Sequence, residues 1–439
     1  MGRTKRLRKR KCTSEDDTKS FVELCKYLGT LGWKNETHLC LKSFEATGRG
    51  LCSKRGTRDE DVLVKMPFEA LVSLYTLEDD EIFRDALFPA LKGKTIHFQA
   101  LLAFYILWNE HRKTPKYLPY LDTIPREFTN PFFCPRDELY FLPENILKET
   151  VEQNQKIKNN FDTLKECLSG HKCSCCGESY FPKIFTLEFF KWAYFAVNSR
   201  CVYIDLSVVS PLKKKSKLRA LLKDEPSFAL APLIDLLNHS DSAGTIAKVK
   251  NQGSLLEYEL QTCRHFKRYE QVFISYGSLP NQKLLVDYGF FLSNNKNDLF
   301  NFSLSDLEGM IKANKTLNAK SIHRNKFRFL ADHNLDQQLF VHRTDGLSHN
   351  LKVVLFVVFK AETHFSNILS ELAFGSHEHF DEAIKDEIKL LVEFKIFEFK
   401  EYLKGLGSLP KLSASGEQCL GYIKECISYL SDYLNKFHS

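Results

Sequence analysis

The chain has 439 residues, of which 43% are hydrophobic, and this is enough for a large core and for two domains. Its apolar runs are far shorter than the roughly 20 residues that a membrane span requires, and no apolar stretch follows the N-terminal charges, so neither a membrane protein nor a secretory signal is expected. Thirteen cysteines scattered along the chain do not suggest a disulfide framework, and a reduced, intracellular protein is expected.

The formal net charge of +7 is concentrated at the N-terminus. Residues 1–11 hold seven Lys and Arg and no acidic residue, so the rest of the chain balances 55 basic against 55 acidic side chains. The body of the protein is therefore not expected to bind nucleic acid. The tail, which we expect to be disordered over residues 1–19, is typical of a nuclear-import signal or of a solvated chain end. A location in both nucleus and cytoplasm is expected.

In chain order, the hydrophobic pattern predicts a small β domain that is interrupted by helices. Strands are predicted at residues 40–44, 50–55, 62–67, 255–262 and 271–276. Helices are predicted at residues 20–31, 98–109, 142–167, 186–198, 303–314, 348–372, 378–404 and 415–437.

Four short motifs mark this chain, and they are Gly48-Arg49-Gly50-Leu51, the segment from Asp235 to Ser240, Tyr276-Gly277 and the segment from Asp287 to Phe290. Alone, each is typical of a turn, a helix end or a strand end. In this order, with a long insertion after the first glycines, they resemble the SET-domain protein methyltransferases. Within that family the chain is similar to the split-SET branch, which is related to the plant Rubisco large-subunit lysine methyltransferase. The motif detail runs from about Thr30 to Asn301.

The resemblance implies an α+β fold with two folded domains after the tail. A SET domain is expected at residues 20–301, split by a helical insertion at about residues 68–196. An all-α substrate-binding domain is expected at residues 302–439. The split-SET branch lacks the Cys-rich segment that follows the SET domain in many histone enzymes, and this chain lacks it as well.

The resemblance also implies an activity, which is methyl transfer from S-adenosylmethionine (AdoMet) to the side-chain amine of a lysine in a protein substrate. Such a displacement needs collinear reactants that are shielded from water, and it needs no metal. Histones are one candidate substrate, given the basic tail. Two alternatives stay open: a histidine acceptor, as in a sister enzyme of this branch that modifies actin, and a catalytically silent SET-fold interaction protein. A monomer is expected.

Seven residues are implied to bind the cofactor. Gly48 and Gly50 allow the backbone to approach a ligand closely, and the planar fork of Arg200 suits a carboxylate. In the family, the positions of Asn238 and His239 contact the amino-acid end and the adenine of AdoMet. The implied cofactor-binding residues are Thr47, Gly48, Arg49, Gly50, Arg200, Asn238 and His239.

Two tyrosines are implied to act on the substrate side. Tyr276 ends a predicted strand and matches the catalytic tyrosine of the family, with its hydroxyl directed at the line of methyl transfer. Tyr288 matches a second tyrosine that frames the lysine channel. Aromatic side chains are common in strands, so a purely structural role is the alternative for Tyr276.

A cysteine-rich segment lies inside the expected helical insertion. It contains Cys167, His171, Cys173, Cys175 and Cys176, so four metal ligands are available in principle. The run Cys-Ser-Cys-Cys departs from the paired Cys-x-x-Cys of zinc sites. We therefore expect a cysteine-bearing loop without a metal.

Overall fold

The structure is a computed structural model that describes residues 15–91, 93–213, 215–253, 255–314, 324–361 and 382–435. These residues form two compact units. The first contains the described chain up to Phe128 together with Val151–Gly277, and the second contains Thr129–Thr150 and the described residues from Ser278 onward. The expected α+β fold class is confirmed.

The division of the chain differs in detail from the predicted boundaries. It falls after Gly277 rather than at Asn301, and residues 129–150 of the expected insertion belong to the second unit. Most of the basic tail lies outside the described residues. Residues 15–19, which were expected to be disordered, open helix α1 (Glu15–Thr30). The assignment of residues 302–439 as a substrate-binding domain stays a prediction.

The β part of the first unit consists of small sheets. Strands β1 (Leu39–Phe44) and β2 (Gly48–Ser53) form an antiparallel hairpin, whose turn uses a positive φ of 71° at Gly48. A three-stranded antiparallel sheet has the order β3-β8-β7. Its strands are β3 (Val62–Pro67), β8 (Leu255–Thr262) and β7 (Thr245–Gln252).

Two further strand pairings were not predicted, because three of the four strands are too short to show alternation and only the fourth lies inside a predicted strand, at residues 271–276. Strands β4 (Cys201–Tyr203) and β5 (Phe228–Leu230) pair in antiparallel fashion. Strands β6 (Asn238–His239) and β9 (Phe273–Ile274) pair in parallel, and this pairing brings the Asn-His motif beside the strand that leads to Tyr276. Residues 35 positions apart in the chain thus become neighbours.

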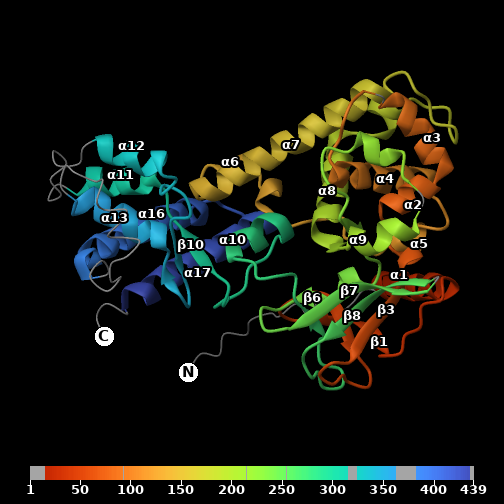
Figure 1. Ribbon diagram of the computed structural model, residues 1–439, viewed down its shortest axis with the longest axis horizontal. Coiled ribbons are helices and arrows are strands. Elements are labelled where there is room, and N and C mark those ends of the chain that lie inside the picture. Colours follow the sequence, from red (N-terminus) through yellow and green to blue (C-terminus); the bar gives the residue numbers. More distant parts are fainter. Residues whose placement is uncertain are drawn as a thin grey trace. The chain divides into compact units, whose positions relative to one another are not determined.

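The insertion is helical as predicted. Helix α4 is apolar on all sides, with every residue from Ala100 to Asn109 buried, as expected for a helix inside a core. It packs against α8, and the helices α2, α3, α4 and α8 gather at one end of the first unit, with β1, β3, β7 and β8 at the other end (Figure 1). The helices of this unit after α1 are α2 (Leu74–Asp79), α3 (Glu81–Ala90), α4 (Phe98–Arg112), α5 (Leu118–Leu121), α7 from Val151 to its end (Glu144–Leu168 in full), α8 (Leu187–Arg200) and α9 (Leu206–Val209), with short helical turns at Phe68–Ala70, Tyr180–Ile184, Ser210–Leu212, Leu218–Leu221 and Ile234–Leu236.

The second unit is mostly helical around one apolar core. Its expected all-α segment also contains two short strands, β11 (Phe340–His342) and β12 (Gly346–Leu347), which form a sheet with β10 (Leu299–Asn301). Helices α16 and α17 pack against each other. The helices of this unit are α6 (Arg136–Leu139), the start of α7, α10 (Asn281–Lys283), α11 (Leu304–Ala313), α12 (Arg324–Asp332), α13 (His349–Phe359), α16 (Lys385–Gly407) and α17 (Ala414–Asn435), with helical turns at Pro131–Phe133 and Leu284–Tyr288.

Within the described ranges, none of the helices is both long enough and apolar enough to cross a membrane.

Candidate functional site

The first feature of the site is a close approach of two side-chain amides to the backbone of β2. A Cβ atom added at Gly50 would lie 2.6 Å from Nε2 of Gln271 and 2.8 Å from Nδ2 of Asn238, so only glycine leaves both amides in place. Thr47 donates from its hydroxyl to Oε1 of Gln271 at 2.8 Å. Gln271 is 7% exposed, and its Nε2 has no hydrogen-bond partner in the part of the chain that the structure describes. This group therefore brings three predicted cofactor residues together.

Asn238 also holds the β1–β2 turn through the backbone. Its Nδ2 donates to the carbonyl oxygen of Arg49 at 3.0 Å. The guanidinium of Arg49 itself donates to Oδ1 of Asp17 at 2.7 Å and to the carbonyl of Thr123 at 2.5 Å. Arg49 therefore contacts Asn238 through its backbone. The Arg49 side chain joins the turn to α1 and to the helical insertion.

His239 and Tyr276 form the second feature. The backbone N–H of Tyr276 donates to Nδ1 of His239 at 3.0 Å, and the two rings stack with centroids 5.1 Å apart. The hydroxyl of Tyr276 donates to the carbonyl of Leu237 at 2.7 Å. His239 is 4% exposed, and burial lowers the pKa of its imidazole below the usual 6.5. Because Nδ1 accepts a hydrogen bond, the neutral ring carries its proton on Nε2.

The third feature is a buried ion pair between the end of α8 and the helical turn Ile234–Leu236. Nη1 of Arg200 donates to Oδ2 of Asp235 at 2.9 Å, with the two side chains 10% and 0% exposed. Tyr120 donates from its hydroxyl to the same oxygen at 2.8 Å. Burial opposes the charged guanidinium, but the carboxylate of Asp235 raises the pKa of Arg200 overall. Burial and the same carboxylate raise the pKa of Tyr120, so this phenol stays neutral.

This ion pair keeps two polar atoms unsatisfied. Among the described residues, neither Nε of Arg200 nor Oδ1 of Asp235 has a hydrogen-bond partner. Buried polar atoms are normally paired, and each exception calls for an explanation such as a water, an ion or a functional role at that place. The sequence singled out Arg200 but not Asp235, Tyr120 or Gln271. Asp235 opens the Asn-His motif and could have been noticed, whereas nothing in the sequence marks Tyr120.

Tyr288 belongs to the second unit. It ends the helical turn Leu284–Tyr288, and its ring lies 6.2 Å from that of Phe290, measured between centroids. Gly289 follows with a φ of 78°, and a Cβ there would lie 2.7 Å from Oγ1 of Thr129. Tyr288 is therefore held at a tightly packed turn. Its role in framing a lysine channel stays a prediction.

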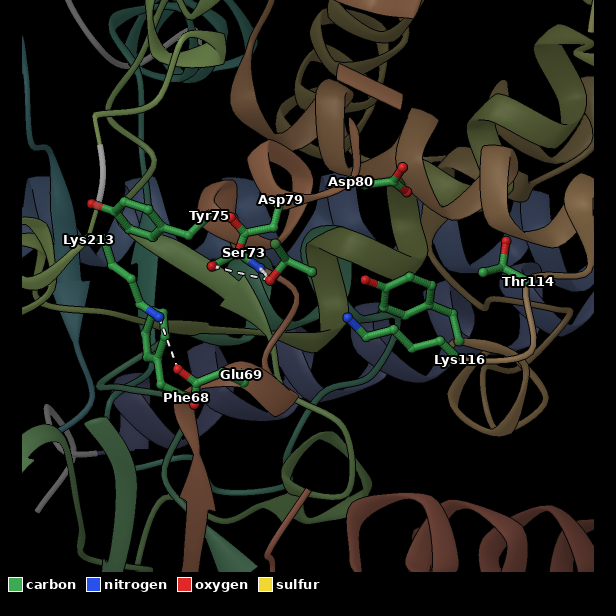
Figure 2. A pocket seen from close by; sticks show the side chains of 11 residues that line it. Phe68, Glu69, Ser73, Tyr75, Asp79, Asp80, Thr114, Lys116 and Lys213 are labelled. Atoms are coloured by element: carbon green, nitrogen blue, oxygen red, sulfur yellow. Dashed lines mark hydrogen bonds and ion pairs between the residues drawn. The ribbon is translucent and has the colours of Figure 1, made fainter. Parts of the chain in front are cut away.

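A cavity of about 330 Å³ lies elsewhere in the first unit (Figure 2). It is bordered by the segment after β3 and by Lys213, whose ammonium pairs with Glu69 at 2.9 Å and lies over the ring of Phe68. Its lining also includes Tyr75 and Lys116. None of the predicted site residues lines this cavity, so it is separate from the candidate site.

Comparison with known proteins gives relatives along most of the chain. No protein-family model matches it. SET domain-containing protein 4 of Mus musculus is 29% identical over 343 residues, which cover 76% of this chain and 72% of the relative. The protein of the same name from Artemia parthenogenetica is 26% identical over 416 residues, covering 94% and 96%. The actin-histidine N-methyltransferase of Gallus gallus is 25% identical over 288 residues, covering 63% of this chain and 43% of that protein.

Solved structures share the fold. The SET domain of LSMT, in a crystal structure with lysine and AdoHcy, superposes with a TM-score of 0.64 over 96% of this chain and 91% of the other, at 18% identity. Rubisco LSMT bound to AdoMet gives a TM-score of 0.61 over 95% of this chain and 91% of the other. The chain is thus a relative of the proteins named SET domain-containing protein 4, and it has the SET-domain fold of the Rubisco LSMT structures.

Proposed function

We propose that this chain is an AdoMet-dependent methyltransferase that modifies the side-chain amine of a lysine in a protein substrate. The observation that carries the proposal is the convergence of the Gly50 turn, the Asn238-His239 strand and Tyr276 within one SET fold. The solved relatives support it, since they were crystallised with AdoMet or AdoHcy and with lysine. Two relatives that are similar over most of their length are named after the same domain.

The residues present fit the cofactor. Nε2 of Gln271 and Nε of Arg200 are buried donors without a partner among the described residues, and AdoMet offers acceptors in its carboxylate and ribose hydroxyls. At Gly50 the backbone is open to close approach. We propose that Thr47, Arg200, Asn238 and the backbone of residues 48–50 hold the cofactor, with Gln271 as an additional donor. When bound, AdoMet supplies a methyl group on a sulfonium sulfur.

The residues around Tyr276 are suited to orient a reaction of this kind. The phenol donates a hydrogen bond to the carbonyl of Leu237, so the lone pairs of its oxygen stay available to a methyl group that carries partial positive charge. Stacking on His239 and the bond from the Tyr276 backbone to Nδ1 fix the position of the ring. Since these partners are in place before substrate binds, little reorganisation is needed at the moment of reaction.

A histidine acceptor is the second candidate function. It is favoured by the similarity to the chicken actin-histidine N-methyltransferase. Radiolabelled AdoMet with a protein mixture, including histones and actin, separates the candidates after hydrolysis of the labelled proteins. Methyl-lysine supports the proposal and methyl-histidine supports the alternative. If no protein is labelled while AdoMet still raises the melting temperature, the chain is a silent SET-fold interaction protein.

We also propose that residues 302–439 bind the protein substrate away from the reacting side chain. Remote contacts of this kind support catalysis by holding the acceptor in line. Lys385 at the start of α16 is about half exposed, and its ammonium lies 3.7 Å from the carboxylate of Glu382. Lys385→Glu should raise the KM for an intact protein substrate at least about threefold and leave the KM for a short peptide unchanged. Surface substitutions on all helices of this segment that leave both values unchanged would contradict the assignment.

A further inference from the structure

We propose that His111, Cys173, Cys175 and Cys176 form a structural zinc site in the helical part of the first unit. The sequence drew attention to the cysteines but paired them with the nearby His171. The fold instead brings in His111, which lies 62 residues before the first of these cysteines. Each of the four residues offers one ligand atom, and these four atoms all lie within 4.8 Å of one another. In the part of the chain that the structure describes, no other cluster of His, Cys, Asp or Glu side chains is this well placed to hold a metal ion.

The distances from the imidazole nitrogen to the three sulfurs are close to those of a tetrahedral set. Nε2 of His111 lies 3.4 Å from Sγ of Cys173, 3.3 Å from Sγ of Cys175 and 3.5 Å from Sγ of Cys176. Zinc bonds of about 2.0–2.1 Å to nitrogen and about 2.3 Å to sulfur, at tetrahedral angles, place nitrogen and sulfur about 3.6 Å apart. Three sulfurs are thus arranged around one imidazole nitrogen at nearly the spacing that a shared zinc ion produces.

A tight loop presents the thiols. The backbone N–H of Cys173 donates to the carbonyl of Glu178 at 2.8 Å, and the N–H of Gly177 donates back to the carbonyl of Cys173 at 2.8 Å. Gly177 adopts a φ of 74°, which closes this turn. The N–H of Cys175 points to Sγ of Cys173 at 3.5 Å. Such a bond stabilises a sulfur that carries negative charge, as a metal-bound thiolate does.

A rigid helix presents the imidazole. His111 lies in the last turn of α4, directly after the buried residues Ala100 to Asn109. Its ring packs edge-on against Phe185, with the centroids 6.2 Å apart. The next residue, Arg112, donates to Oγ of Ser174 at 3.0 Å and so ties the helix end to the cysteine loop. Both sides of the site are therefore positioned by contacts that do not involve a metal.

The composition of the site indicates its chemistry. Three soft thiolates and one neutral imidazole select zinc over magnesium or calcium, which prefer oxygen ligands. With Zn²⁺ they leave one net negative charge, which the guanidinium of Arg112 is placed to offset. Four protein ligands close the coordination sphere, and this is typical of a structural site rather than a catalytic one. The ion would join α4 to the loop that follows α7, independently of methyl transfer.

A disulfide is the competing interpretation of the same cysteines. Sγ of Cys173 and Sγ of Cys175 are 3.0 Å apart, which is closer than the roughly 3.8 Å between sulfurs on one tetrahedral zinc ion. A Cys173–Cys175 disulfide, however, gives no reason for His111 to lie beside all three sulfurs. Cys173 is 2% exposed and Cys175 and Cys176 are exposed, so the ion would sit at the edge of the core.

The test is metal content and affinity of the full-length protein, purified in reductant without added metal and then loaded with zinc. We expect about one zinc per chain, and with cobalt(II) the visible bands of a tetrahedral thiolate site. Cys175→Ser and His111→Gln should each lower zinc affinity at least tenfold. Cys263→Ser and His171→Gln are matched controls, because these residues are not in the ligand group, and both should keep full metal content.

Folding is checked in the same samples by circular dichroism, and the exposed Cys176→Ser provides a second variant if His111→Gln does not fold. A chelator should lower the melting temperature of the natural protein and of both controls, but not of Cys175→Ser. A folded protein that binds no zinc would overturn the proposal. So would a Cys173–Cys175 disulfide that is found by mass spectrometry in place of metal, or equal zinc affinity in Cys175→Ser and the natural protein.

Discussion

The backbone N–H of Tyr276 donates to Nδ1 of His239 at 3.0 Å, and this single bond joins the two motifs that the sequence places 37 residues apart. It requires a neutral acceptor nitrogen, since an imidazolium has no lone pair to accept with. The bond therefore links the protonation state of His239 to the position of the proposed catalytic tyrosine.

The first prediction concerns the pH dependence of stability. Burial lowers the pKa of His239 below 6.5 in the folded state, so below pH 6.5 the unfolded chain binds this proton more readily than the folded one. The contribution of neutral His239 to the free energy of unfolding is fully present above pH 6.5. It is lost as pH falls through the folded pKa, by up to about 1.4 kcal/mol per pH unit. Urea unfolding between about pH 5 and 7 should show this slope, and His239→Asn should reduce it.

The exposed His265 provides the control for that experiment. His265→Asn should leave the slope as it is in the natural protein. A slope that is the same in both variants and the natural protein would assign the pH dependence to other groups.

The second prediction concerns the hydroxyl of Tyr276. Tyr276→Phe removes the hydrogen bond to the carbonyl of Leu237, which should cost about 1 kcal/mol of unfolding free energy, while methyl transfer should fall at least tenfold. The exposed Tyr269→Phe is the matched control and should keep both values. Initial rates with labelled AdoMet measure the effect. An unchanged rate in Tyr276→Phe would exclude a catalytic role for this hydroxyl.

The third prediction concerns the close approach at Gly50. Gly50→Ala places a methyl group 2.6 Å from Nε2 of Gln271 and 2.8 Å from Nδ2 of Asn238, so one or both amides must move. We expect a loss of about 1–3 kcal/mol of stability and an AdoMet affinity at least tenfold weaker, measured by calorimetry. Gly29→Ala is the control, because nothing lies within 4 Å of a Cβ there. Equal AdoMet affinities in Gly50→Ala and Gly29→Ala would mean that cofactor binding does not depend on this turn.

The fourth prediction compares a buried with an exposed ion pair. Asp235→Ala leaves the buried guanidinium of Arg200 without its carboxylate and should cost about 3–5 kcal/mol of unfolding free energy. Glu225→Ala breaks the ion pair with Arg219, in which the Arg219 side chain is 45% exposed and the Glu225 side chain 68% exposed. This change should cost about 0–1 kcal/mol of unfolding free energy. Urea unfolding of both variants gives the comparison. Similar small losses in the two would show that Arg200 finds another partner when Asp235 is removed.

The last prediction concerns the basic run at residues 1–11, a part of the chain that the structure does not describe. We propose that this run supports a nuclear pool of the protein, in which histones would be accessible as substrates. Removing residues 1–11 takes away the entire net charge of +7. Nuclear accumulation should fall, and the rate of methyl transfer to a short peptide should stay the same. Equal nuclear levels of both proteins, observed by fluorescence microscopy, would show that the run is not an import signal.

The sequence by itself determined the elements whose pattern is local. The apolar run at residues 98–109 predicted helix α4, and the pieces at 40–44 and 62–67 predicted β1 and β3, because side-chain periodicity follows directly from helix and strand geometry. The order of the motifs was enough to indicate the SET fold. The two-residue strand β6 left no periodicity to detect, so its parallel pairing with β9, which lies inside the strand predicted at residues 271–276, could not be predicted.

Only the tertiary structure decided which distant side chains meet. Gln271 lies against Gly50, Asp235 pairs with Arg200, and His111 joins Cys173 in place of the neighbouring His171. Each of these contacts joins residues at least 35 positions apart in the chain. Such contacts are selected by how the whole unit packs, because side chains close in sequence often point in different directions while a shared core fixes which surfaces face one another.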